Sequence, residues 1–168
     1  MGRAVALSGS WRTTTPELHK DLVEAVVDVV RSGGTIVTGG ALGVDMIATQ
    51  AVLGEPGGDR AIKVILPTPL AVYAAHYRMR AQEGVITTEV AEELVALLER
   101  LERGGALWCL EGTACTEETY YARNSAVLAH SDELYAFWVN GSDGTKDTID
   151  KARALGMACT VWEYSTEL

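Results

Sequence analysis

Short apolar runs alternate with amphipathic stretches of helical spacing over nearly the whole of this chain. The first three apolar runs are AVALS (4–8), TIVT (35–38) and AIKVILP (61–67), and helical stretches separate them. Alternation of this kind is typical of a parallel sheet covered by helices. The pattern therefore predicts an α/β protein with three layers: an open, mostly parallel sheet and helices on both of its faces.

The second half of the chain continues the alternation. Helices are expected at about 88–103, 116–130 and 145–156, and strands at 106–110, 133–139 and 158–164. The run ELYAFWV (133–139) is apolar on both faces, as a central parallel strand must be when helices cover both sides of its sheet. Residues 69–87 show no clear periodicity and are interpreted as a long loop, or as a short helix with a loop.

The length of 168 residues, without a linker or an internal repeat, predicts a single domain over residues 1–168. The chain shows no signal-peptide pattern and no apolar run of membrane-spanning length, so we expect a cytoplasmic protein without a membrane partner. Cys109, Cys115 and Cys159 form an odd set without CxxC spacing. They are interpreted as free thiols in or near the core, in a reducing compartment.

Charge bears on the partners of the protein. The formal net charge of −9 disfavours a nucleic-acid partner, because Lys and Arg contacts to phosphate supply most of that affinity. A leucine stripe on the expected helix at 88–103 could serve a homo-oligomer interface. Packing of these leucines against the sheet is the interpretation that we favour.

Three of the expected strands end in turns of small residues. The turns are Ser8-Gly9-Ser10, Gly39-Gly40-Ala41-Leu42-Gly43 and Gly141-Ser142-Asp143-Gly144-Thr145. In open α/β sheets, ligands bind at the carboxyl ends of the strands. Glycine permits a close backbone approach to a phosphate, and the hydroxyl groups of Ser8, Ser10, Ser142 and Thr145 add hydrogen-bond donors. The turns therefore predict a site for an anion or a nucleotide at this edge of the sheet.

Several familiar motifs are absent from the sequence. The turn GGALG follows the second strand rather than the first and lacks the GxGxxG order, and GxxxxGK[ST] does not occur. HExxH, CxxC and GxSxG are also absent. We therefore expect no metal site and no required cofactor, and the sequence does not identify catalytic residues.

Three segments, in their order along the chain, resemble the SLOG superfamily. They are TGGALGVDMIA, ARN (122–124) and AFWVNGSDGTKDTIDKARALG. The superfamily unites the DprA/Smf group, the YspA-type proteins and the LOG phosphoribohydrolases, and the similarity covers about residues 4–163. It implies a Rossmann-like fold whose glycine turns hold the phosphates of nucleotides or nucleotide-derived ligands. The positions that match are Gly39, Gly40 and Gly43 in the first turn, Asp45 after it, Arg123 and Asn124 in the Arg-Asn pair, and Gly141, Ser142, Gly144 and Thr145 in the second phosphate loop.

The resemblance implies that Arg123 pairs with phosphate through its planar guanidinium group. A solvated helix arginine is the alternative. Asp45 has a structural alternative as well, because a helix dipole stabilises an acidic residue in the first turn without any ligand. Arg78 is counted among the phosphate-binding residues because its segment follows the third strand, whereas His76, in the same segment, fits a surface group better.

Aromatic residues offer a further option for a ligand. Tyr73, Tyr77, Tyr120 and Tyr121 could stack on a base, although aromatic residues near a cleft are as often packing. Phe137 and Trp138 are assigned to the core.

One departure from the family pattern concerns catalysis. The resemblance to the LOG enzymes implies a loop Pro-Gly-Gly-x-Gly-Thr-x-x-Glu, whose glutamate acts with an arginine on an N-glycosidic bond. Here Asn140 stands for the proline, Ser142 for the second glycine and Thr148 for the glutamate. A threonine cannot replace the carboxylate. Glu117 and Glu118 are weak substitutes, and Asp147 lies one residue away from the required position.

Several functions follow from the resemblance. The first, which we choose, is a sensor or carrier that binds a nucleotide or a nucleotide-derived small molecule. The alternatives are a LOG-like phosphoribohydrolase acting on nucleoside 5'-monophosphates, a DprA-like single-stranded DNA-binding protein and, less favoured, a carrier of the molybdenum cofactor.

Overall fold

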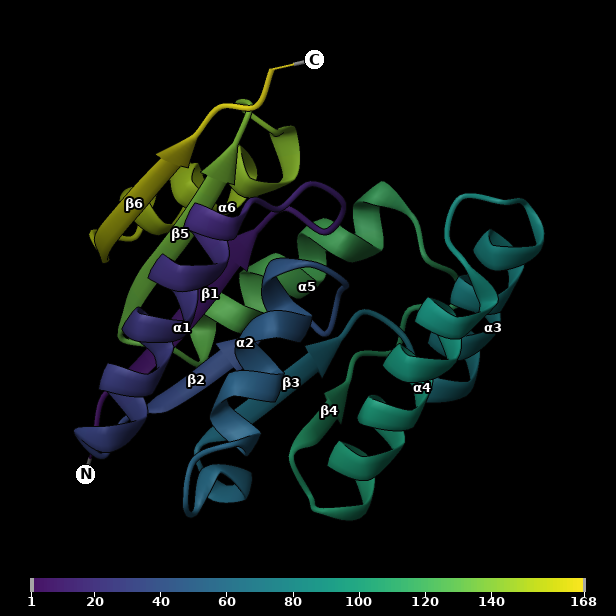
Figure 1. The fold of residues 1–168 in the computed structure, drawn as a ribbon, viewed down its shortest axis with the longest axis horizontal. Coiled ribbons are helices and arrows are strands. Elements are labelled where there is room, and N and C mark those ends of the chain that lie inside the picture. Colours follow the sequence, from purple (N-terminus) through teal and green to yellow (C-terminus); the bar gives the residue numbers. More distant parts are fainter. Residues whose placement is uncertain (1, 168) are drawn as a thin grey trace.

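The computed structural model describes residues 2–167, and its centre is one sheet of six strands, all parallel (Figure 1). The strand order is β4-β3-β2-β1-β5-β6. The strands are β1 (Ala4–Gly9), β2 (Thr35–Thr38), β3 (Ile62–Leu66), β4 (Leu107–Cys109), β5 (Glu133–Val139) and β6 (Ala158–Tyr164). The predicted α/β class with a Rossmann-like open sheet is confirmed, and β5 lies between β1 and β6 rather than at an edge.

Helices cover both faces of the sheet (Figure 1). They are α1 (Pro16–Arg31), α2 (Val44–Leu53), α3 (Leu70–Gln82), α4 (Thr88–Arg103), α5 (Glu117–Ala129) and α6 (Asp143–Ala154), with a short 3-10 helix η1 (Gly58–Arg60). Helices α1, α2 and α4 share one hydrophobic cluster with the sheet, and α5 and α6 share the other. The three predicted layers are therefore present.

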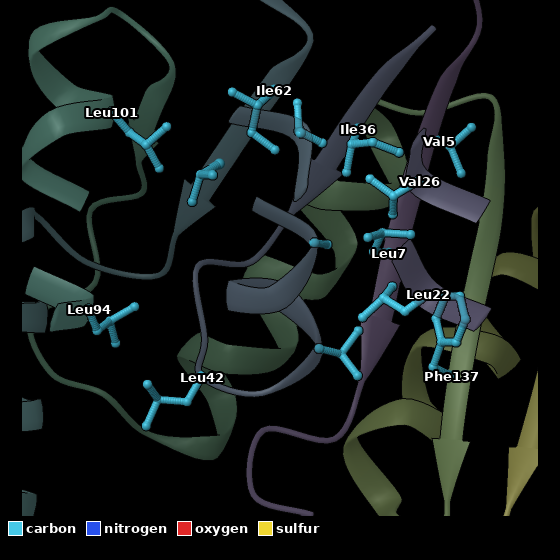
Figure 2. Packing of buried hydrophobic residues seen from close by; sticks show 14 of the residues in the cluster. Val5, Leu7, Leu22, Val26, Ile36, Leu42, Ile62, Leu94, Leu101 and Phe137 are labelled. Atoms are coloured by element: carbon cyan, nitrogen blue, oxygen red, sulfur yellow. The ribbon is translucent and has the colours of Figure 1, made fainter. Parts of the chain in front are cut away.

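Alternation along β1 divides its side chains between the two clusters. Val5 and Leu7 belong to the cluster under α1 and α2, whereas Ala6 belongs to the cluster under α5 and α6. Figure 2 shows Leu22 and Val26 of α1 lying over Leu7. Such two-sided burial is what a central parallel strand requires.

The sequence also predicts where α1 begins and ends. Thr15 accepts a hydrogen bond from the backbone N–H of Leu18, Pro16 is the first helical residue, and Gly33 follows the helix with φ of 86°. These are a side-chain N-cap and a left-handed residue after the C-cap. The leucines of α4, including Leu94 and Leu98, are buried within the molecule, so packing against the rest of the fold explains this stripe.

Of the two interpretations of residues 69–87, the long loop is wrong and the helix with a loop is confirmed, because α3 covers Leu70–Gln82. Its buried face is small: Tyr73, Ala74 and Tyr77 point inward, and polar residues interrupt the pattern elsewhere. The Tyr73 hydroxyl donates a hydrogen bond to the carbonyl oxygen of Gly40 at 3.0 Å. Tertiary contacts with the glycine turn therefore stabilise a helix that periodicity does not reveal.

Two smaller predictions about the core need correction. Cys109 is exposed because β4 is a short edge strand, although Cys115 and Cys159 are partly buried. Trp138 is only partly buried against the core, and its indole N–H donates to the carbonyl oxygen of Ser142 at 3.0 Å, whereas Phe137 is fully buried as expected. Among residues 2–167, no helix is both long and apolar enough to cross a membrane.

The strand order also locates the site. From β1 the chain proceeds outward through β2, β3 and β4 in one direction, and β5 and β6 lie on the other side of β1. The topological switch point therefore lies between β1 and β5. Crevices at such points, outside the carboxyl ends of the strands, are where open α/β sheets bind ligands.

Candidate functional site

A cavity of about 730 Å³ lies at the carboxyl ends of β1, β2 and β5. Its walls come from the turns after these strands, from the first turn of α6, from α5 and from the C-terminal half of α3. Cavities of this size accommodate small-molecule ligands. The two turns at the switch point, after β1 and after β5, thus face one shared space.

The first turn of α6 opens onto this cavity. Ser142 precedes the helix but caps no backbone N–H, and its hydroxyl donates to the hydroxyl of Thr145 at 3.2 Å. Within residues 2–167, the amides of Asp143, Gly144 and Thr145 have no hydrogen-bond acceptor; the next amide, that of Lys146, donates to the carbonyl oxygen of Ser142. Free amides and the positive end of the helix dipole together form an anion seat.

The glycine turn after β2 is organised differently. The amides of Gly39 and Ala41 both donate to one carboxylate oxygen of Asp45, at 3.2 Å each. Gly40 faces the core, since a Cβ atom there would lie 2.5 Å from Cδ2 of Leu66. This turn therefore presents neither of the two amides bound by Asp45 to a ligand.

Asp45 is buried, and burial raises the pKa of its carboxyl above the ordinary value. The positive charge of Arg123 and the two donated amides act in the opposite direction and offset part of this effect. Asp45 is thus an internal anion that holds the glycine turn in shape. Its charge also makes this wall of the cavity less favourable for a phosphate.

Arg123 of α5 lies at the floor of the cavity and is only 8% exposed. Its Nη1 donates to the carbonyl oxygen of Gly39, its Nε donates to Oδ1 of Asn124 at 3.1 Å, and its guanidinium group lies over the ring of Tyr120 at 5.3 Å. Nη2 has no hydrogen-bond partner among residues 2–167. The alternative of a solvated helix arginine is therefore wrong, and Arg123 keeps a donor for a guest.

Gly39 is required by this arrangement. A Cβ atom at position 39 would lie 2.5 Å from the guanidinium carbon of Arg123. Any other residue would displace Arg123 from the floor of the cavity.

The fold is similar to that of DNA processing protein A (DprA) from Helicobacter pylori, whose structure was determined to study how it binds single-stranded DNA. The TM-score is 0.71 and the identity 22%, over 95% of this chain and 64% of that chain. This chain has the DprA-like fold. DprA from Streptococcus pneumoniae is similar with a TM-score of 0.52, 16% identity and coverage of 95% and 58%. The chain thus spans less than two thirds of the length of either DprA structure.

The structural-genomics target TM1055 is also similar, with a TM-score of 0.56, 17% identity and coverage of 94% of this chain and 72% of that chain. No model of a known protein family matches the sequence, and no curated protein shows significant similarity to it. The Rossmann-like fold that the sequence resemblance implies agrees with these similarities.

Most of the predicted ligand-binding residues line the cavity of this DprA-like fold. They are Ser8, Gly9, Ser10, Gly39, Asp45, Arg123, Asn124, Ser142, Gly144 and Thr145. Residues from all three predicted turns, which are distant in sequence, are therefore brought together around one space. Binding by these residues stays a prediction.

The other predicted residues lie elsewhere in the DprA-like fold. Gly40 faces the core, and Gly43 packs against the backbone of Ser10 and Trp11. Gly141 turns the chain before α6 with φ of 66° but does not line the cavity. Arg78 is exposed on α3 and forms an ion pair with Glu92 of α4 at 2.8 Å, because α3 directs it away from the cavity.

The cavity also has lining residues outside the predicted phosphate-binding set. Trp11, Arg12 and Thr13 line it, and so does Arg80 of α3. The sequence indicates these residues only through their neighbours, since residues 11–13 directly follow Ser10 and Arg80 is one helical turn after His76. His76 also lines the cavity, and burial together with the charge of Arg80 lowers its pKa.

The tyrosines have different environments. Tyr77, Tyr120 and Tyr121 line the cavity, whereas Tyr73 is fully buried and belongs to the core. Burial raises the pKa of Tyr120 strongly, so this hydroxyl is a hydrogen-bond donor at neutral pH.

The carboxylates around the cavity bear on its chemistry. Thr148, at the position of the LOG glutamate, lines the cavity, and its hydroxyl donates to the carbonyl oxygen of Gly144 at 3.3 Å. Asp147 is paired with Lys151 at 3.0 Å and does not line the cavity. Glu117 does line it, whereas Glu118 does not. Within residues 2–167, no three His, Cys, Asp or Glu side chains are grouped as metal ligands.

Proposed function

We propose that the cavity binds a nucleotide or a nucleotide-derived small molecule, and that the phosphate of this ligand lies at the N-terminus of α6. The observation that carries the proposal is the set of free amides at Asp143, Gly144 and Thr145, which opens onto the same cavity as the buried Arg123. Amides at a helix N-terminus favour a dianionic group, and an arginine fork matches phosphate oxygens.

The polar groups near this seat complement the ligand. The hydroxyls of Ser142 and Thr145 line the cavity beside the free amides. Tyr77 of α3 and Tyr120 and Tyr121 of α5 also line the cavity and add aromatic surface that suits a ribose. The nucleotide is proposed as the ligand of this cavity, and we propose no cofactor in addition to it.

A role as a sensor or carrier is favoured over hydrolysis. N-glycoside cleavage needs a carboxylate near the sugar, and the family position for it holds Thr148. Glu117, the remaining candidate, lines the cavity, and its charge helps to raise the pKa of Tyr121. Glu117 does not stand at the family position for the carboxylate.

Single-stranded DNA is the second candidate ligand, because the fold is similar to that of a DprA studied for this activity. Arg12, Arg80 and Arg123 line the cavity and could follow a phosphate backbone. The net charge of −9 opposes this role. DNA binding to loop arginines would also weaken steeply with salt.

Calorimetric titration with AMP, ADP-ribose and a short oligonucleotide, at low and high salt, tests the proposal. We expect AMP and ADP-ribose to bind more tightly than the oligonucleotide. Replacing Arg123 by lysine keeps the charge but loses the planar fork, so the affinity should fall about tenfold. The matched control is Arg78→Lys, which changes an arginine outside the cavity and should leave the affinity unchanged.

Two outcomes would overturn the ranking. Tight oligonucleotide binding with a steep salt dependence and little affinity for AMP would favour the DNA-binding role. Release of free base from AMP that disappears in Arg123→Ala would favour the hydrolase instead.

A further inference from the structure

Trp11 is a large apolar side chain that lines the cavity and yet is 40% exposed. The other large hydrophobic residues with comparable exposure are Met79, Trp108 and Leu155, and none of these lines the cavity. An exposed tryptophan is ordinary on a surface, but one at the mouth of a ligand cavity is placed where a planar ligand can cover it.

The backbone of Trp11 is held in place. The Ser10 hydroxyl oxygen accepts hydrogen bonds from the amides of Arg12, at 3.3 Å, and Thr13, at 2.8 Å. The Ser10 carbonyl oxygen accepts one from the amide of Val44 at 2.9 Å. A backbone that is held in place before binding loses little conformational entropy when a ligand contacts its side chain.

Gly43 completes this support. A Cβ atom at position 43 would lie 2.2 Å from the carbonyl oxygen of Ser10 and 2.8 Å from Cα of Trp11. The absence of a side chain therefore lets the loop of Trp11 rest directly on the start of α2. This contact gives Gly43 a function other than phosphate binding, and it explains why a residue outside the cavity matters to the site.

The other aromatic rings of the cavity are less exposed than that of Trp11, since Tyr120 and Tyr121 are half-buried. Tyr77 is buried, with its hydroxyl 3.4 Å from that of Tyr73. The ring of Tyr120 faces the guanidinium group of Arg123 at 5.3 Å, and that of Tyr121 faces the ammonium group of Lys151 at 5.2 Å. Of the cavity tyrosines, none is as exposed as Trp11.

Arg12 adds a second element. Its guanidinium carbon lies 5.6 Å from the centre of the Trp11 ring, and within residues 2–167 Arg12 forms no ion pair. The Trp11 ring thus has a cation over it and still exposes part of its surface to solvent. Nucleobases stack on aromatic surfaces of this kind.

We infer that Trp11 is a stacking platform for the nucleobase of the ligand, so that the base rests at the mouth of the cavity while the phosphate lies at the N-terminus of α6. This inference rests on the proposed function and deepens it. The ligand class is a phosphate-bearing compound with an aromatic base, rather than a sugar phosphate alone. Stacking accepts any base, so the platform provides affinity with little selectivity among bases.

The experiment compares AMP with ribose 5-phosphate, which has the same phosphate and sugar but lacks the base. The wild type should bind AMP more tightly. Trp11→Leu should weaken AMP binding by at least about fivefold, because stacking of a base on an aromatic ring contributes that much or more. The affinity for ribose 5-phosphate should not change, and Trp11→Phe, which keeps a ring, should retain most of the AMP affinity.

Trp108→Leu is the matched control, because it removes an equally exposed tryptophan on β4, outside the cavity. AMP should quench the tryptophan fluorescence of the wild type and of Trp108→Leu, but not that of Trp11→Leu. Wild-type affinity for AMP in Trp11→Leu, or an equal loss for both ligands, would overturn the platform. Equal binding of AMP and ribose 5-phosphate by the wild type would overturn the platform alone, and failure to bind either would overturn the proposed function with it.

Discussion

At the scale of single residues, Asp45 and Arg123 form the polar floor of the cavity. Both are buried, and Gly39 connects them, because its amide donates to Asp45 and its carbonyl oxygen accepts from Arg123. Two opposite charges that share one backbone unit hold the turn after β2 in a single conformation. Removal of Arg123 would leave the buried Asp45 carboxylate without a countercharge.

The raised pKa of Asp45 gives the stability a pH dependence. In the native state this carboxyl keeps its proton to a higher pH than in the unfolded chain, where its pKa is near the ordinary 3.8. The native state therefore binds more protons between these two pKa values, and the contribution of Asp45 to stability falls as the pH rises through this window.

Asp45→Asn, which cannot ionise, should remove this contribution. Urea unfolding from pH 3.5 upward should show the wild type losing stability relative to the variant as the pH rises, until the native pKa is passed. A wild type that instead gains stability relative to Asp45→Asn would mean that Arg123 and the two amides outweigh burial.

The sequence predicts that Gly39 and Asp45 belong to the site, but it does not predict the hydrogen bonds that they form. The motif around Gly39 and Asp45 identified them through the family resemblance, and the structure brings them to the cavity. That Asp45 accepts the amides of Gly39 and Ala41 depends on a side-chain orientation within a turn, which spacing alone does not determine. The same holds for Arg78, whose partner Glu92 lies on another helix.

At the scale of elements, the first turn of α6 can be tested through Gly144. A Cβ atom at this position would contact no other atom within 4 Å, and its φ is not positive. Gly144→Ala should therefore stabilise the protein by about 0.5 kcal/mol, because alanine restricts the unfolded chain and favours the helix. The added methyl group would face the cavity, so the affinity for AMP should fall.

Gly141→Ala serves as the comparison, because its φ of 66° is strained for alanine and predicts a loss of stability. Chemical denaturation and calorimetry on the same samples measure both effects. If Gly144→Ala gained stability and kept its full affinity for AMP, the phosphate could not lie on these amides.

The elements themselves differ in how well the sequence predicts them. β5 and α4 are evident, since one is apolar on both faces and the other carries a regular leucine stripe. α3 is not, because it buries only a few residues, and its hydrogen bond from Tyr73 to Gly40 joins segments distant in sequence. For the helix that supplies His76 and Arg80 to the cavity, the sequence therefore does not decide between a helix and a loop.

At the scale of the whole molecule, the sheet order brings the turn after β1 next to the turn after β5. Ser8–Ser10 and Ser142–Thr145 lie more than 100 residues apart in the chain, yet both line the same cavity. The strand alternation predicts a parallel sheet, but the order of its strands is a property of the complete fold. The proposed ligand can contact Trp11 with its base and α6 with its phosphate only because the turns after β1 and β5 are adjacent.

The most direct test of the phosphate seat is a titration of the isotope-labelled protein with AMP, followed by amide NMR. The account predicts that the largest shifts fall on the backbone amides of Asp143, Gly144 and Thr145, which are free before binding. The amides of Gly39 and Ala41, already bound to Asp45, should shift less. Large shifts at Gly39 and Ala41 with none at 143–145 would contradict it.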